Sequence, residues 1–122
     1  MNVMPLCHIN STFFTFTFLY IGGAVYLHPA RSFRAEEILD IIEDKKITFI
    51  SLIPTHYNLI LNVPDHARKR DVSSIKKLLC SSAPVRRQVK KAIMDFFTGV
   101  QLYEAYGSSE AGIVTVDRKS VV

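Results

Sequence analysis

The stretch ITFISLIPTHYNLILNV, residues 47–63, has the pattern of a strand that runs directly into a helix. Residues 47–53 are apolar and rich in β-branched side chains, and Pro54 ends this run. Thr55 then begins a segment in which apolar residues recur with helical spacing. This stretch therefore predicts one strand-helix unit of an α/β fold.

The same alternation extends outward in both directions. The predicted strands are residues 24–27, 47–53, 78–81, 100–103 and 113–116, and the predicted helices are 11–21, 33–46, 55–63 and 85–97. Ser11 and Ser32 are the expected N-caps of the first two helices, and Gly22-Gly23 ends the first. Strands that alternate with helices of this length predict a mostly parallel sheet with helices on its faces.

Polar residues follow the predicted strands at the edge where such sheets bind ligands. The segment YEAYGSSE, residues 103–110, supplies an aromatic ring, a glycine, hydroxyls and a carboxylate without a break. An aromatic ring can stack on a purine, glycine admits close backbone approach, hydroxyls can bond phosphate oxygens and a carboxylate can hold Mg²⁺. A helix start capped by Ser108 or Ser109 explains the same residues and stays open on this segment alone.

Four segments together resemble the adenylate-forming superfamily, which includes acyl-CoA synthetases, luciferases and peptide-synthetase adenylation domains. They are PLCHINS at 5–11, KITFISLIPT at 46–55, SSIKKLLCSSAP at 73–84 and YGSSE at 106–110. The resemblance covers nearly all of residues 5–116 and keeps the family's order. It implies that the chain is a slice of the large N-terminal domain of an acyl-CoA synthetase-like enzyme, with a layered, mostly parallel sheet and flanking helices.

The resemblance also implies a role for individual residues. Tyr106 would stack on adenine, Ser109 would contact the α-phosphate and Glu110 would hold Mg²⁺. Ser109 stands where threonine is usual, and its hydroxyl keeps that contact possible. His8 would orient the acyl carboxylate, although a structural corner histidine remains an alternative. The implied nucleotide-binding residues are Ser82, Ala83, Pro84, Tyr106, Gly107, Ser108 and Ser109, and the implied acid pocket comprises His8, Ile9, Asn10, Ser11 and Thr55.

The function implied is that of an ATP-dependent carboxylic acid:CoA ligase, with ATP or AMP, Mg²⁺ and CoA as ligands. The alternatives are an adenylation domain that loads a carrier protein and a non-catalytic nucleotide-binding remnant. The family's phosphate loop is expected before residue 1, and its small carboxy-terminal domain with a catalytic lysine is expected after Val116. This chain alone is therefore expected to be inactive. Residues 117–122 fit neither pattern and match one reading frame of a sequencing adapter, so a non-native tail is expected there.

Composition, charge and cysteine content limit the class of protein and its cellular location. With 122 residues, 48% hydrophobic content and a net charge of +4, the chain is expected to be a globular domain or part of one. The basic residues at 86–91 lie on the polar side of an amphipathic helix, which favours a solvated face over a nucleic-acid site. Cys7 and Cys80 are expected to be buried free thiols, which fits a cytoplasmic location. The apolar run from 13 to 27 is expected to be core and not a transmembrane segment, because polar residues and glycines interrupt it.

Overall fold

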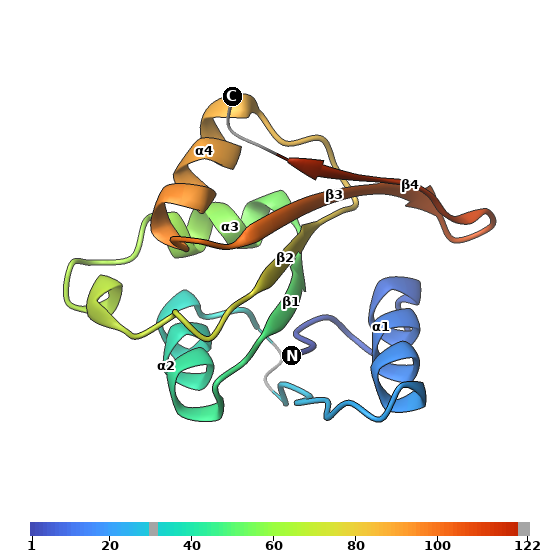
Figure 1. Cartoon of the computed structure of the whole chain (residues 1–122), viewed down its shortest axis with the longest axis horizontal. Coiled ribbons are helices and arrows are strands. Elements are labelled where there is room, and N and C mark those ends of the chain that lie inside the picture. Colours follow the sequence, from blue (N-terminus) through green and yellow to red (C-terminus); the bar gives the residue numbers. More distant parts are fainter. Residues whose placement is uncertain (30–31, 120–122) are drawn as a thin grey trace.

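The computed structural model describes residues 1–29 and 32–119. Its central element is a four-stranded sheet in the order β1 (Phe49–Leu52), β2 (Lys77–Cys80), β3 (Gln101–Ser108) and β4 (Gly112–Lys119). The first three strands are parallel, and β4 pairs antiparallel with β3 (Figure 1). The predicted α/β class and the mostly parallel sheet are confirmed.

Helices α3 (Pro54–Leu61) and α4 (Arg87–Phe96) make the crossovers between the parallel strands, and α2 (Ala35–Lys45) precedes β1. A short 3₁₀ turn, Ala67–Lys69, lies in the predicted loop after α3. Pro54 occupies the first turn of α3, where its missing N–H costs no helical hydrogen bond. The sequence therefore places the start of this helix within one residue.

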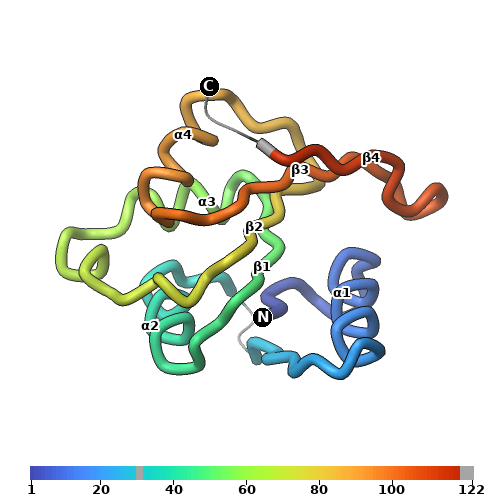
Figure 2. Tube along the Cα trace, viewed as in Figure 1, coloured from blue at the N-terminus to red at the C-terminus, as the bar shows by residue number. Residues whose placement is uncertain are grey.

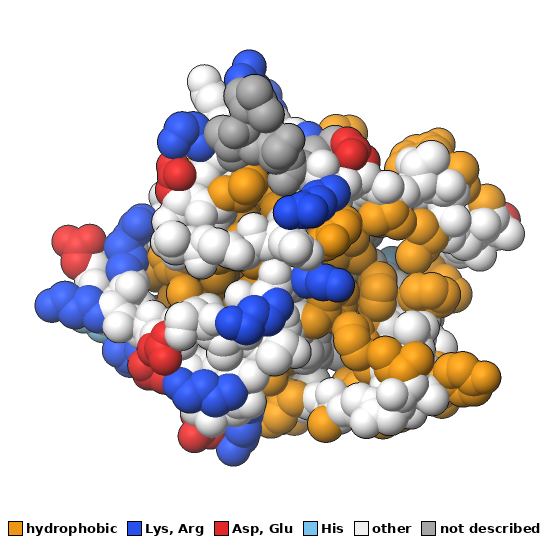
Figure 3. All heavy atoms as spheres, in the orientation of Figure 1, with side chains coloured by type: hydrophobic (Ala, Val, Ile, Leu, Met, Phe, Trp, Pro, Cys, Tyr) orange, Lys and Arg blue, Asp and Glu red, His pale blue; other side chains and the backbone are white. Residues whose placement is uncertain are grey.

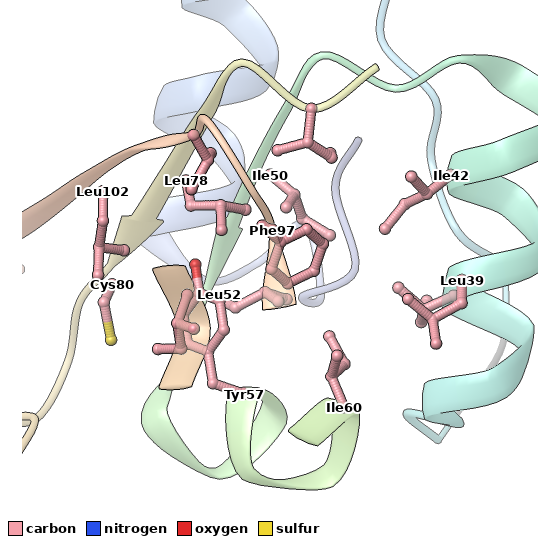
Figure 4. Packing of buried hydrophobic residues seen from close by; sticks show 14 of the residues in the cluster. Leu39, Ile42, Ile50, Leu52, Tyr57, Ile60, Leu78, Cys80, Phe97 and Leu102 are labelled. Atoms are coloured by element: carbon pink, nitrogen blue, oxygen red, sulfur yellow. The ribbon is translucent and has the colours of Figure 1, made fainter. Parts of the chain in front are cut away.

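The hydrophobic core lies between the sheet and α2, α3 and α4 (Figure 4). Alternate strand residues point into it, because successive side chains of a strand face opposite sides. The core members that Figure 4 labels are Leu39, Ile42, Ile50, Leu52, Tyr57, Ile60, Leu78, Cys80, Phe97 and Leu102. The fully buried Tyr57 donates its hydroxyl hydrogen to the carbonyl of Leu79, at 2.9 Å, so the core keeps its phenol satisfied.

The opposite face of the sheet meets α1 (Ile9–Tyr20), which stands apart from the other helices in Figure 2. Phe49 points to this side, and its ring lies 5.2 Å from Phe14 and 5.0 Å from Phe18. Ser51 of β1 and Leu79 of β2 also line cavities beside α1. The candidate functional site lies on this side of the sheet.

Several predictions for residues 7–27 are wrong. Helix α1 begins at Ile9 and not at Ser11, because His8 serves as its N-cap. Residues 24–27 form no strand, since only an isolated bridge joins Leu27 to Asn2. The apolar run is not core, because Phe16, Leu19, Tyr20 and Ile21 are exposed while Ser11 and Thr15 are buried. Helix α2 likewise begins later than predicted, and its N-cap is Arg34 instead of Ser32.

The carboxy-terminal strands are longer than predicted. Strand β3 runs through Tyr106 to Ser108, and β4 extends past Val116 to pair Asp117 with Glu104 and Lys119 with Leu102. The hairpin reaches away from the body of the molecule toward the side on which α1 lies (Figure 1). Residues 117–119 of the predicted tail thus belong to β4, and residues 120–122 lie outside the described residues. That residues 117–122 are non-native remains a prediction.

The described helices include none with the length and hydropathy needed to cross a bilayer. Helix α1, the most apolar of them, spans 12 residues. A span of the hydrocarbon layer takes about 20 residues.

The two cysteines differ in exposure, which corrects the prediction that both are buried. Cys7 is exposed and Cys80 is buried. Burial, together with the nearby charge of Glu104, raises the pKa of the Cys80 thiol to about 12. At neutral pH the Cys80 thiol is therefore almost wholly protonated, and only the thiolate is reactive.

We therefore expect a thiol-specific aromatic disulfide reagent at neutral pH to modify Cys7 rapidly in the native chain and Cys80 only after unfolding. Release of the coloured thiol measures both steps, and Cys7→Ser should abolish the first while leaving the second. Equal rates for both thiols in the native chain would show that β2 is open to solvent.

Candidate functional site

A cavity of about 330 Å³ lies between the start of α1 and the β3–β4 hairpin. Figure 3 shows a hollow between the hairpin and α1, with hydrophobic side chains around it. Residues from opposite ends of the sequence meet here: 8–10 from α1 and its cap, 81–82 from the loop after β2, and 105–109 from β3 and its turn. The carboxyl ends of the parallel strands therefore supply part of the wall, as expected for this fold class.

Most of the predicted site residues line this cavity. They are His8, Ile9, Asn10, Ser82, Tyr106, Gly107, Ser108 and Ser109. Ala83 and Pro84 are exposed in the same loop as Ser82 but do not line the cavity, and Glu110 lies one residue beyond the lining, in the hairpin turn.

Two predicted acid-pocket residues lie elsewhere. Ser11 is 1% exposed and turns away from this cavity, and its hydroxyl donates to Oδ1 of Asn2 at 2.8 Å. Thr55 is exposed in the first turn of α3 and does not line the cavity. Ser11 instead lines the neighbouring cavity between α1 and β1, and Thr55 lines neither cavity, so their roles in binding an acid stay predictions.

His8 is both the N-cap of α1 and a wall of the cavity. Its Nδ1 accepts a hydrogen bond from the backbone N–H of Asn10, at 3.3 Å. A ring nitrogen that accepts carries no proton, so the proton lies on Nε2, which can donate. His8 thus caps α1 through Nδ1 and can also donate a hydrogen bond from Nε2 at the cavity.

The loop after β2 is held in an uncommon backbone conformation. Ser82 has φ of 71°, in the left-handed region that favours glycine. Glu104 of β3 anchors the far end of this loop, because its carboxylate accepts from Lys90 Nζ at 2.6 Å and from the backbone N–H of Val85 at 3.4 Å. Lys90, predicted to lie on a solvated face, is instead half-buried in this ion pair.

Gly107 is required by the hairpin itself. The ladder shifts register between Tyr106 and Gly107, and a Cβ at position 107 would lie 2.1 Å from the carbonyl oxygen of Gly112. Backbone would have to move to admit any side chain. Glycine here therefore serves the close approach of the two strands. The neighbouring Tyr106, 72% exposed, is left at the mouth of the cavity.

Glu110 is a fully ionised carboxylate at neutral pH. Hydrogen bonding to its own backbone N–H, and then to the Ser108 hydroxyl, holds the pKa of Glu110 below its usual value. The described residues contain no group of three or more His, Cys, Asp or Glu side chains that could hold a metal. One carboxylate can hold Mg²⁺ when phosphates and water supply the other ligands, and the role of Glu110 in binding Mg²⁺ stays a prediction.

Sequence reasoning missed part of the wall. Leu79, Phe13 and Ile113 give the cavity an apolar side, and Ser81 bonds to Asn10 within it. Leu79 could have been found from the strand alternation, because its neighbours Leu78 and Cys80 face the core. Ile113 reaches the cavity wall only because β4 pairs antiparallel with β3, and no local pattern in the sequence predicts that pairing.

Residues 1–121 match the family described as AMP-binding enzyme. The chain belongs to the AMP-binding enzyme family. The predicted resemblance to adenylate-forming enzymes is thereby confirmed. A feruloyl-CoA synthase from an Amycolatopsis species is 34% identical over 102 residues, which make up 82% of this chain and 20% of that protein. The 4-coumarate–CoA ligase CCL1 of Humulus lupulus is 28% identical over 113 residues, 92% of this chain and 20% of that protein.

A solved structure, the luciferase-like enzyme from the mealworm Zophobas morio, superposes with a TM-score of 0.85 at 26% identity. The match covers 94% of this chain and 26% of that one. The chain thus spans about one fifth of the length of the curated relatives it matches. By family it belongs to an enzyme.

Proposed function

We propose that this chain provides the nucleotide-facing and acid-facing wall of an ATP-dependent carboxylic acid:CoA ligase. The observation that carries the proposal is the cavity that joins His8 to Tyr106 and Ser109, about 100 residues away in the sequence. The names of the two curated relatives above, a CoA synthase and a CoA ligase, support the same reaction class.

In the proposed reaction a carboxylate oxygen attacks the α-phosphorus of ATP, and the bond to the bridging oxygen breaks as pyrophosphate leaves. The thiol sulfur of CoA then attacks the acyl carbon, the thiol proton is lost and AMP departs. Tyr106 stacks on adenine, the Ser109 hydroxyl donates to an α-phosphate oxygen and His8 donates from Nε2 to the acid. Mg²⁺ held at Glu110 would offset the negative charge of the phosphates.

The test is a chimera in which residues 1–116 replace the matching segment of the Amycolatopsis feruloyl-CoA synthase. We expect acid-dependent release of pyrophosphate, followed by thioester formation when CoA is added. Pyrophosphate release without a thioester would point to a different acceptor, and nucleotide binding without pyrophosphate release would identify a non-catalytic remnant.

In this chimera, His8→Ala is expected to slow adenylation by about 10- to 100-fold, the worth of one hydrogen bond to a charged group. It should also change the ranking of acids, and loss of the cap should lower the free energy of unfolding by about 0.5–2 kcal/mol. Pyrophosphate release across an acid panel and a melting curve measure these effects.

His8→Asn is the matched control, because asparagine keeps an acceptor for the N-cap but lacks the imidazole. It should restore stability without restoring the rate or the ranking. Recovery of all three by His8→Asn would leave His8 with a structural role alone.

A further inference from the structure

The loop after β2 is attached at both of its ends to other elements by hydrogen bonds. At its first end, Oγ of Ser81 accepts from Nδ2 of Asn10 in α1, at 2.7 Å. At its far end, the backbone N–H of Val85 donates to Oε1 of Glu104 in β3, at 3.4 Å. Between these ends Ser82 has a φ of 71°, which is strained for a residue other than glycine. Such a conformation persists only where the surroundings hold it, so the two attachments keep the loop in shape.

Lys90 of α4 holds the carboxylate that makes the far attachment. Its Nζ donates to Oε2 of Glu104 at 2.6 Å, while Oε1 of the same carboxylate accepts from Val85. The Lys90 and Glu104 side chains are only 22% and 23% exposed. Solvent screens an ion pair at this depth less than an exposed one, so water compensates poorly for the loss of either charge. Lys90 therefore acts on the loop through Glu104.

Glu104 also leads directly into the residues that line the candidate site. Successive strand residues face opposite sides, so Glu104 lies on the same face of β3 as the core residue Leu102. Ala105 and Tyr106 follow in the strand and line the cavity, and Ser82 lines it from the loop. One carboxylate thus joins the two walls between which the nucleotide is proposed to bind: the loop after β2 and the end of β3.

We propose that Lys90 and Glu104 are positioning residues that fix the distance between these two walls, and so set the affinity of the site for AMP and ATP without touching either. This inference rests on the proposed function, since it takes Tyr106 and the loop as the walls around adenine. Only molecules whose loop is in place bind the nucleotide, so the observed affinity falls with the fraction of molecules that keep it there. The acid, proposed to lie beside His8, does not need the far end of the loop.

The experiment measures binding of AMP and of 3-phenylpropanoate to the full 122-residue chain by ligand-observed NMR, together with hydrogen exchange of the Val85 amide. Lys90→Glu brings a second carboxylate against Glu104. Combining Lys90→Glu with Glu104→Gln is the rescue, because the amide at position 104 can donate to the new carboxylate while its oxygen still accepts from Val85. Lys91→Glu is the matched control, because it reverses the charge of the next residue, whose ion pair with Asp95 is exposed, at 61% and 64%.

We expect Lys90→Glu to weaken AMP binding by at least about 10-fold, the factor that a hydrogen bond to a charged group is worth. Exchange of the Val85 amide should speed up by about the same factor, because both report the fraction of open loop. Affinity for the acid should change by less than about twofold, since separate sites respond independently. The double variant should return AMP binding and exchange to within about threefold of the unmodified chain. Lys91→Glu should leave both within about twofold, as a surface change does.

Unchanged AMP binding in a folded Lys90→Glu chain would overturn the proposal. Equal weakening of AMP and acid binding, or a double variant that stays as weak as Lys90→Glu, would overturn it as well, because the pair would then have only a general structural role. If Lys90→Glu does not fold, as judged by its melting curve, Lys90→Met removes the charge alone, and unchanged AMP binding in that variant overturns the proposal instead.

Two further results separate this inference from the proposed reaction. Failure of the unmodified chain to bind AMP would overturn the nucleotide site and this inference together. Weaker AMP binding by Lys90→Glu, with recovery in the double variant, beside a chimera that releases no pyrophosphate would uphold the inference and reject the proposed reaction.

Discussion

In the chimera described above, Glu110→Gln is expected to slow acyl-adenylate formation by about 100- to 1000-fold, because a bound divalent metal contributes several kcal/mol of charge stabilisation to phosphoryl chemistry. Glutamine keeps the size and the hydrogen-bonding capacity of the side chain but removes its charge. Binding of the acid should stay nearly unchanged, since Glu110 lies beyond the residues that line the acid-facing cavity. Pyrophosphate release at varied Mg²⁺ concentration measures the effect.

The Mg²⁺ dependence separates metal binding from a structural role in the hairpin. The variant should need a higher Mg²⁺ concentration for half-maximal rate, and Glu110→Asp, which keeps the charge, should recover part of the loss. Because its hydrogen bonds lower the pKa of Glu110, the carboxylate is charged throughout the neutral range, so the defect should not vary with pH there. An unchanged Mg²⁺ requirement in Glu110→Gln would assign the metal to other groups.

The strand-helix units between residues 47 and 103 could be predicted from the sequence because local signals there agree with the tertiary packing. Pro54 begins α3 where a proline is tolerated, and Ile93 faces the core from the apolar side of an amphipathic helix. Residues 8–27 were harder because hydrophobicity and burial disagree. Their buried members are the polar Ser11 and Thr15, which bond to Asn2, whereas the aromatic Phe16 and Tyr20 face outward.

The lining of the cavity could be predicted from residue types beside predicted strands, but not where it depends on contacts between segments distant in the sequence. Tyr106 and Ser109 are predicted as nucleotide contacts from their residue types next to a predicted strand, and both line the cavity. The bond from Asn10 to Ser81 joins residues 71 positions apart, and nothing in either segment indicates the partner. Gly107 shows that the sequence can predict a glycine but not its reason. It was expected to admit a ligand, whereas the close approach of β4 is what requires it.

The largest effect on stability is expected from Phe97→Ala. Phe97 is 2% exposed and lies within the core between the sheet and the helices (Figure 4). Removing its ring forfeits apolar burial and leaves a cavity that neighbouring side chains fill only in part, which costs about 3–5 kcal/mol. Native domains are stable by only about 5–15 kcal/mol, so this loss should consume much of the total. A urea titration should show a lower midpoint with an unchanged slope.

Phe16→Ala removes the same atoms from an exposed position on α1, where Phe16 is 66% accessible. It should change the free energy of unfolding by no more than about 0.5 kcal/mol. The difference between the two variants isolates burial, because the residue type lost is the same and both positions are at or within a helix. Similar losses of stability in both variants would mean either that another surface covers α1 in solution or that the core is open to solvent. Hydrogen exchange separates these explanations, because only a covered α1 would slow the exchange of the amides near Phe16.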